Sequence, residues 1–315
     1  MVEQSIYSFF LKITLFLLIS FFSNHSFADY KGLKKISKNN SFMDDKGIPY
    51  ATDLITDKEN TLLLIWNHGS GQDTKTDKCK KKPKFGYTWD GAVSPAILQF
   101  HNKPIKNLEI KIFRLCSGVK GMSVKEQDEI LNLIKKGKKI DNYSELKQQK
   151  RQNIIINEVE KFIEKGFYNI VIGGYSAGGW ASLNLMSRYP DKFKGAIAFN
   201  PAFAGPKQEW NKALPNWGFF REEQINQLKK TDTLNALVFV HKNDEFETPE
   251  TLSFLYNFNE INMIDYSELK ATECTWADVN KTMPKEAGHS IPQSSCFVEY
   301  ENQNEFILNY LESIF

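Results

Sequence analysis

The sequence predicts an α/β protein with a single, mostly parallel central sheet and helices on both faces. From residue 61 onward, continuous apolar runs of strand length alternate with stretches that have helical periodicity. Continuous apolar runs are typical of parallel strands that are buried on both sides. Since strand-helix-strand units cross over with right-handed geometry, this alternation predicts a parallel sheet covered on both faces.

The expected strands come first in this assignment. They cover 50–55, 61–66, 108–116, 170–172, 195–199 and 235–240, with a further short run at 263–265. Expected helices cover 92–100, a long stretch from about residue 145, a stretch after residue 176 and the C-terminal end. In the long helix the apolar residues recur at helical spacing, and Gly166 is placed as its C-terminal stop. Residues 117–145 are polar and rich in lysine, and we expect a surface excursion there.

Ser176 stands where a predicted buried strand meets a predicted helix, in the run Gly174-Tyr-Ser-Ala-Gly178. A serine at such a junction sits on a strained turn, and flanking glycines remove Cβ atoms where strand and helix approach. The hydroxyl can then project from the edge of the sheet. The alternative is a glycine-rich connection without a chemical role.

The composition is that of an ordinary globular protein. The chain has 315 residues, of which 41% are hydrophobic, and its 40 basic residues nearly balance 38 acidic ones. That balance gives no case for nucleic acid as a partner. The length suits one large α/β domain, which we expect to cover residues 29–315.

Residues 1–28 have the features of a cleavable secretory signal. An apolar run at 13–22 follows Lys12, and Ser26-Phe27-Ala28 offers small residues at the expected cleavage site. A retained membrane anchor is the alternative, but the apolar run falls well short of the roughly 20 residues needed to span a bilayer. We therefore expect a periplasmic or secreted protein without a stable membrane anchor.

An even number of cysteines in an exported chain predicts two disulfides, and three connectivities are open: the four residues are Cys79, Cys116, Cys274 and Cys296. No C-x-x-C pair is present and no histidines cluster near the cysteines. We therefore expect neither a metal nor a cofactor.

Two further segments each have two interpretations. The lysine-rich run at 73–84 could attract an anionic substrate or form a solvated loop, and the loop is favoured. The second segment could line a substrate pocket or pack against the core: its aromatic residues are Phe203, Trp210, Trp217, Phe219 and Phe220.

Ser176, Asp244 and His289, in that order, all lie just after predicted strands. A serine hydroxyl needs a base to accept its proton, and a carboxylate on the other imidazole nitrogen orients that base. With the His68-Gly69 turn after an early strand, these residues resemble the α/β-hydrolase family over residues 61–315. Within the family, the chain is most similar to the dienelactone-hydrolase-like and secreted esterase branches.

The resemblance implies a role for each residue. Ser176 matches the nucleophile, His289 the base and Asp244 the acid, while the backbone N–H groups of Ser70 and Ala177 match the oxyanion hole. His68 is expected to fix the turn. Asp244 and His289 are 45 residues apart, a longer interval than the family's usual one, so Glu247 is the second candidate for the acid.

The function implied by the resemblance is an exported serine hydrolase that cleaves small carboxylic esters, with short-chain or aromatic acyl groups, through an acyl-enzyme. An acyltransferase or a peptidase would use the same triad, and a non-catalytic binding protein could share the scaffold. The neighbouring strands of the family's sheet also imply the disulfide pairs Cys79–Cys116 and Cys274–Cys296.

Overall fold

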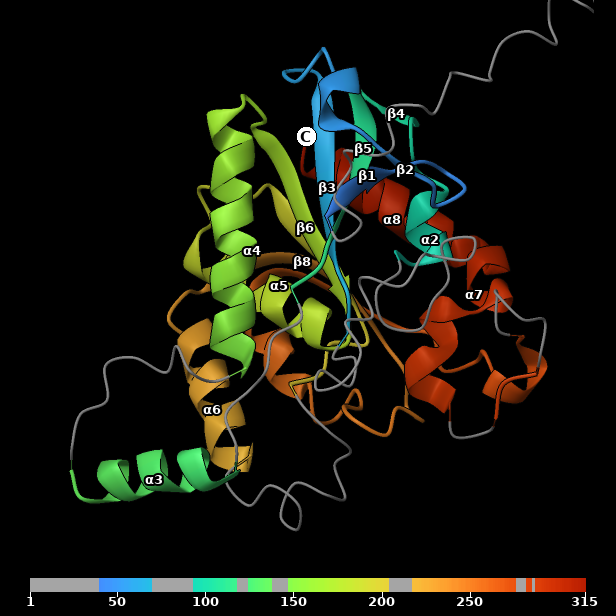
Figure 1. The fold of residues 1–315 in the computed structure, drawn as a ribbon. Coiled ribbons are helices and arrows are strands. Elements are labelled where there is room, and N and C mark those ends of the chain that lie inside the picture. The colour runs from blue at the N-terminus through green and yellow to red at the C-terminus, as the bar shows by residue number, and fades with distance from the viewer. Residues whose placement is uncertain are drawn as a thin grey trace, which may run out of the picture. The chain divides into compact units, whose positions relative to one another are not determined.

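The computed structural model describes residues 40–69, 93–117, 124–137, 147–203, 217–275, 282–284 and 287–315. All of them belong to one compact unit, Ser37–Phe315 (Figure 1). The signal peptide expected at 1–28 lies outside the described residues. No helix in the described parts of the chain is both long and apolar enough to cross a membrane.

Nine strands within the described residues form one sheet, ordered β2-β1-β5-β3-β6-β7-β8-β9 with β4 paired to β5. The parallel strands are β3 (Thr61–Asn67), β5 (Leu108–Leu115), β6 (Asn169–Tyr175), β7 (Gly195–Phe199), β8 (Thr233–Val240) and β9 (Asn259–Asp265). Antiparallel pairs occur at one side of the sheet, through β1 (Ser41–Met43), β2 (Pro49–Tyr50) and β4 (Pro104–Ile105). The predicted mostly parallel α/β sheet is therefore confirmed.

The central strands form where the chain is apolar without interruption. Every residue of β3 is buried, and in the register Leu64 lies between Ile112 of β5 and Val171 of β6. The strand expected at 50–55 is wrong. The chain leaves the sheet at Tyr50 and turns through a 3-10 helix, Thr52–Leu54, where Leu54 is 69% exposed and offers no buried face to extend a strand.

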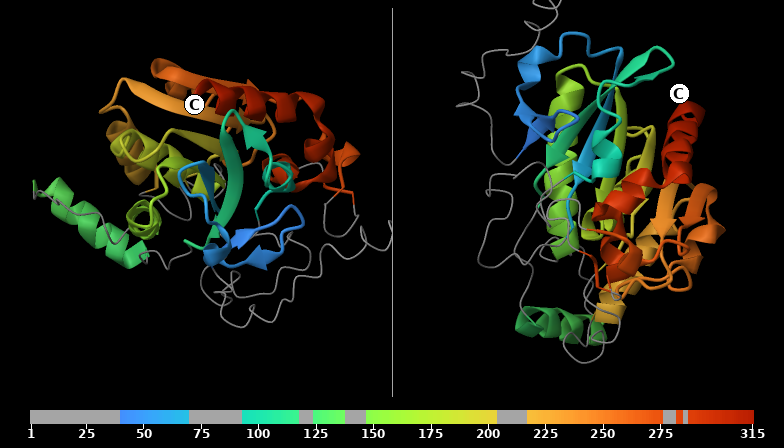
Figure 2. Two further views of the ribbon diagram at one scale, coloured as in Figure 1. Left: turned by 90° about the horizontal axis from the view of Figure 1, so that it is seen from above. Right: turned by 90° about the vertical axis from the view of Figure 1, so that its right-hand side faces the viewer.

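Helices cover both faces of the sheet (Figure 2). One face carries α4 (Lys147–Glu164), α5 (Ala177–Arg188) and α6 (Trp217–Leu228), and the other carries α2 (Pro95–Leu98), α7 (Ser295–Glu299) and α8 (Glu301–Ser313). From β3 the chain moves outward to β5, then returns past β3 to β6 and continues to β7 and β8. Because right-handed crossovers in opposite directions lie on opposite faces, α2 is separated from α4, α5 and α6.

The C-terminal end of the long helix α4 is determined by the local sequence. Gly166 adopts φ +93°, and the N–H groups of Gly166 and Phe167 donate to the carbonyls of Ile163 and Phe162. This is a Schellman closure, which requires the left-handed conformation that glycine adopts without strain. The predicted stop at Gly166 is thus confirmed.

Two of the longer helices were not expected from the sequence. Helix α3 (Val124–Lys135) lies within the stretch assigned to a surface excursion, and α6 lies in the aromatic segment. Helix α3 buries Leu131, whereas Leu133 on the same helix is 38% exposed. Short 3-10 helices complete the fold at Ser253–Asn257 (η5), Ala271–Glu273 (η6) and Ala287–Gln293 (η7).

Strands β3 and β6 are neighbours from which the chain departs in opposite directions across the sheet. Ligands of open parallel sheets bind in the crevice beyond the carboxyl ends of the strands at such a switch point. Functional side chains are therefore expected beyond the carboxyl ends of β3, β6, β7 and β8.

Candidate active site

Ser176 lies at the junction of β6 and α5 in a conformation that few residues other than glycine adopt, with φ 56° and ψ −123°. Its neighbours hold the backbone there. Its N–H donates to Phe199 O at 2.9 Å, and its own carbonyl accepts from the N–H groups of Trp180 and Ala202 at 2.9 and 3.1 Å. Strained backbone that the surroundings hold in place on several sides is characteristic of functional sites.

Gly174 and Gly178, on either side of Ser176, lie where the backbone leaves no room for a Cβ atom. A Cβ on Gly178 would lie 2.2 Å from Asn67 O, and a Cβ on Gly174 would lie 2.5 Å from the carbonyl carbon of Gly178. The start of α5 thus packs directly against the ends of β3 and β6. This close approach explains why the junction has the pattern Gly-x-Ser-x-Gly.

The turn after β3 lies beside the serine. A Cβ on Gly69 would be 3.2 Å from the Cβ of Ser176. Arg151 of α4 donates from Nη1 to His68 O at 2.8 Å, and His68 Nδ1 is 2.5 Å from Gly69 O. The buried His68 ring therefore fixes this turn, in agreement with the expected role.

The two proposed oxyanion donors differ in what can be described. Ala177 is the first residue of α5 and is buried directly after Ser176. The first N–H groups of a helix have no partner within the helix and are available to a developing anion. Ser70 lies outside the described residues.

Asp244 and His289 meet although 45 residues separate them: Nδ1 of His289 is 2.7 Å from Oδ2 of Asp244. The other oxygen, Oδ1, accepts from the N–H groups of Phe246 at 2.7 Å and Glu247 at 3.3 Å. Both side chains are buried. Because the carboxylate accepts the Nδ1 proton, Nε2 is left as the basic nitrogen of a neutral imidazole.

His289 lies next to β6, the strand that ends directly before Ser176. The His289 ring packs on Tyr175, the residue before Ser176, with ring centroids 5.0 Å apart. Phe246 packs on the same imidazole at 4.3 Å between centroids. The structure thus brings His289 together with Asp244 and with the end of β6, as the chain order of the three residues predicts.

Asn200 is a site residue that the sequence did not indicate. It follows β7, is fully buried with φ +43°, and donates from Nδ2 to His289 O at 2.8 Å and Gly288 O at 3.2 Å. Its Oδ1 accepts from the Tyr266 hydroxyl at 2.9 Å. The available signal was its position directly after a buried strand, which Ser176 shares.

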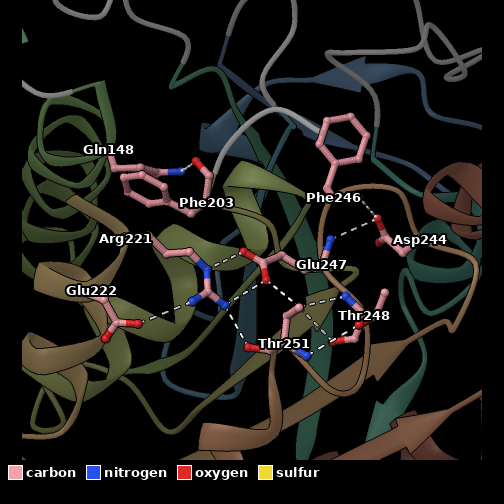
Figure 3. Close-up of polar contacts among 9 residues, drawn as sticks. All are labelled: Gln148, Phe203, Arg221, Glu222, Asp244, Phe246, Glu247, Thr248 and Thr251. Carbon is pink, nitrogen blue, oxygen red and sulfur yellow. Dashed lines mark hydrogen bonds and ion pairs between the residues drawn. The ribbon is translucent and has the colours of Figure 1, made fainter. Parts of the chain in front are cut away.

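Glu247, the second candidate for the acid, has a different partner. Its carboxylate forms a two-pronged ion pair with Arg221 of α6, with Nε–Oε1 and Nη2–Oε2 distances of 2.8 Å (Figure 3). Burial raises the pKa of the Glu247 carboxyl, while the hydrogen bonds from Arg221 and Thr251 act in the opposite direction. The geometry therefore favours Asp244 over Glu247 as the partner of His289.

The aromatic segment contributes to the core. Phe203 packs on Trp180 with centroids 5.6 Å apart, and Phe220 is buried in the same apolar cluster, with Phe219 partly buried against it. Of the two interpretations, the structure therefore supports packing against the core for Phe220. Trp210 and the side chain of Trp217 lie outside the described residues, as does the lysine-rich run at 73–84.

The cysteines are placed in part. A disulfide joins Cys274 to Cys296, the expected pair, with a Cα–Cα distance of 5.4 Å. Cys116 is also disulfide-bonded, and Cys79 lies outside the described residues. Within the described ranges, no group of three or more His, Cys, Asp or Glu side chains could hold a metal ion.

The phospholipase/carboxylesterase family model matches residues 129–220, which include α4, β6, the serine and α5. No curated protein matches the chain. Among solved structures, the monoacylglycerol lipase of Paleococcus ferrophilus is 13% identical, with 88% of this chain and 98% of that chain covered and a TM-score of 0.44. Est1E from Butyrivibrio proteoclasticus is 12% identical, with coverage of 87% and 99% and a TM-score of 0.45.

Oligopeptidase B from Trypanosoma brucei is 15% identical, with 88% of this chain but 38% of that chain covered and a TM-score of 0.46. The family match falls on the segment that carries the strained serine, and the sheet has the parallel order that the resemblance implied. Over this segment the chain is similar to the phospholipase/carboxylesterase family, in agreement with its resemblance to the α/β-hydrolase superfamily.

Proposed function

We propose that the chain is an exported carboxylic ester hydrolase in which Ser176 is the nucleophile, His289 the base and Asp244 the acid. The observation that carries this proposal is the 2.7 Å contact between Asp244 and His289, whose ring packs beside the end of β6. The match to the phospholipase/carboxylesterase family supports a carboxylic ester as substrate.

In the first half of the reaction, Oγ of Ser176 attacks the ester carbonyl carbon and transfers its proton to Nε2 of His289. The oxyanion is stabilised by the N–H groups of Ala177 and Ser70. When the carbon–oxygen bond breaks, His289 returns the proton to the departing alcohol, and the acyl group remains on Ser176. Water then repeats the sequence, and the carboxylic acid leaves.

Asp244 is suited to the protonated imidazole that forms in each half-reaction. Its carboxylate is withdrawn from solvent, and two backbone N–H groups on Oδ1 replace part of the lost hydration. The remaining oxygen then holds Nδ1 of His289 and stabilises its positive charge when Nε2 accepts a proton.

We propose that esters with short-chain or aromatic acyl groups are the preferred substrates. The partly exposed Phe246 beside His289 offers a compact apolar surface, whereas Phe220 is in the core. A series of p-nitrophenyl esters of increasing chain length, compared by kcat/KM with and without Phe246→Leu, tests this preference. An optimum at long acyl chains, or an unchanged preference in the variant, would contradict it.

Export is tested by the N-terminal sequence of the protein recovered outside the cytoplasm. Cleavage after Ala28 is expected from the small residues at that position. A protein that keeps residues 1–28 and remains with the membrane would show a retained anchor instead.

The catalytic assignment is tested with a fluorophosphonate probe, which labels an activated serine. Ser176→Ala should abolish labelling and lower ester turnover by at least ~10³-fold, and His289→Ala should behave similarly. Ser187→Ala is the matched control, because Ser187 lies at the far end of α5 and donates to Leu228 O. Full turnover by Ser176→Ala would rule out the assignment.

A further inference from the structure

Arg221 and Glu247 form a buried ion pair that the reaction described above does not use. Besides its two contacts with Arg221, the Glu247 carboxylate accepts from the Thr251 hydroxyl at 2.7 Å, and Arg221 Nη2 donates to Thr251 O at 2.7 Å (Figure 3). The Glu247 side chain is 0% exposed. The pair therefore ties helix α6 to the turn that begins at Asp244.

The guanidinium of Arg221 also contacts the helix that begins at the serine. It lies 5.6 Å from the ring centroid of Trp180 in the first turn of α5, and 5.8 Å from that of Phe254. A planar, delocalised cation can stack on aromatic rings while its edge binds a carboxylate. One side chain thus links α5, α6 and the turn at 244–251.

Glu247 is connected to Asp244 through its backbone. Its N–H donates to Oδ1 of Asp244, next to the donation from Phe246, whose ring packs on His289. The side chain of Glu247 anchors the turn, and its N–H contacts the acid. A shift of Glu247 would therefore move one of the three donors that hold the Asp244 carboxylate.

We propose that Arg221 and Glu247 are positioning residues that hold the turn after β8 so that Asp244 meets His289. This inference rests on the proposed function of that site. The cation also offsets the repulsion between the Glu247 and Asp244 carboxylates, which interact with each other. A buried ion pair stabilises a fold little more than apolar side chains of similar size do, whereas its two-pronged geometry specifies one arrangement.

Three variants distinguish an effect on the placement of Asp244 against His289 from an effect on the stability of the fold. Glu247→Gln keeps the shape and removes the negative charge; R221M/E247L replaces the pair with apolar side chains; Arg221→Lys keeps the positive charge but loses the planar fork. The matched control is Glu222→Gln, because Glu222 also contacts Arg221, at 3.8 Å, but is 60% exposed.

Two readouts report on His289 itself. One is the acidic limb of the kcat/KM profile against pH, and the other is the proton NMR signal of the Nδ1–H group, which does not require turnover. Asp244 is the charged group that contacts this ring among the described residues. The Tyr175 ring packs on His289, and the phenol of Tyr266, which lies near Asp244, carries no charge at neutral pH because burial raises its pKa.

In R221M/E247L we expect a folded protein with kcat/KM about 10- to 100-fold lower, between full activity and the ~10⁴-fold loss typical of disabling the acid. The acidic limb should move to lower pH, because a displaced Asp244 stabilises the imidazolium less. The Nδ1–H signal should shift upfield or broaden. Glu247→Gln should show the same changes, Arg221→Lys smaller ones, and Glu222→Gln none.

Folded R221M/E247L or Arg221→Lys protein with unchanged kcat/KM, acidic limb and Nδ1–H signal would overturn the positioning role. So would a loss of thermal stability without a change in the other three measurements. If wild type lacks esterase activity, but the Nδ1–H signal of His289 in the variants differs from that of wild type as expected, the proposed function fails and the positioning role stands.

Discussion

Asn200 donates from Nδ2 to the main-chain carbonyl of His289 at 2.8 Å and so ties the end of β7 to η7, the 3-10 helix that carries His289. The ring of His289 is held separately, through Asp244 at the end of β8. Two neighbouring strands thus position one residue, one through its backbone and one through its side chain.

Asn200→Ala should lower the free energy of unfolding by about 2–4 kcal/mol, because it leaves the Tyr266 hydroxyl and two carbonyls buried without their partner. Turnover should fall as well, since the backbone of His289 loses its anchor. Urea unfolding and kcat/KM measure the two effects. Tyr266→Phe is the control. It removes the hydrogen bond to Oδ1 of Asn200 alone, and it should lower the free energy of unfolding by about 1–2 kcal/mol with little loss of turnover. Equal effects of the two variants on turnover would contradict this role for Asn200.

The buried phenol of Tyr266 should make the free energy of unfolding depend on pH in the alkaline range. Its complete burial, and to a lesser degree the charge of Asp244, raises the pKa of the phenol well above its ordinary value. The folded pKa is therefore higher than the unfolded one, so this stability is fully present below about pH 10 and is lost as pH rises toward the folded pKa.

Urea unfolding at several pH values between 8 and 11 should show this loss, at up to about 1.4 kcal/mol per pH unit for one such group. Tyr266→Phe should reduce the slope above pH 10 without removing it, because burial also raises the pKa of Tyr310. Tyr256→Phe is the control, since Tyr256 is 63% exposed. A slope that is the same in wild type and Tyr266→Phe would exclude Tyr266 as a source.

The Cys274–Cys296 disulfide closes a chain segment that contains His289. The double variant C274A/C296A should lose about 2–4 kcal/mol of unfolding free energy if the bond acts mainly on the unfolded chain. Wild type treated with a reductant should lose at least as much, because the reductant also acts on the disulfide of Cys116. If the double variant unfolds at the wild-type urea concentration, the disulfide has no such role.

The parts of this fold that the sequence predicts are those encoded by neighbouring residues. The apolar run of β3, the junction at Ser176 and the stop at Gly166 each depend on a few consecutive side chains. Asp244 follows β8, so its place at the carboxyl edge of the sheet follows from the strand order. The expectation that His289 comes directly after a strand is wrong: it lies in η7, well past the end of β9 at Asp265, and its pairing with Asp244 was implied by the family resemblance.

The parts that the sequence did not predict depend on contacts between distant residues. Asn200 binds a carbonyl 89 residues away, and after a strand it resembles an ordinary turn residue. Arg221 lies on a helix whose polar and aromatic residues show no clear apolar face, so its pairing with Glu247 had no local signal. Helix α3 was missed because its mostly polar residues were assigned to a surface excursion, although Leu131 is buried.

Two glycines in helices offer a matched test of the junction at Ser176. Gly178→Ala would place a Cβ 2.2 Å from Asn67 O, and neither backbone can yield without moving β3 or α5. We expect a loss of at least about 3 kcal/mol, or no folded protein. Gly218, near the start of α6, has no atom of the described residues within 4 Å of the same position, so Gly218→Ala should be neutral or raise stability by up to about 1 kcal/mol. Soluble yield and urea unfolding measure both, and a Gly178→Ala protein as stable as Gly218→Ala would show that α5 does not pack on β3 as closely as described.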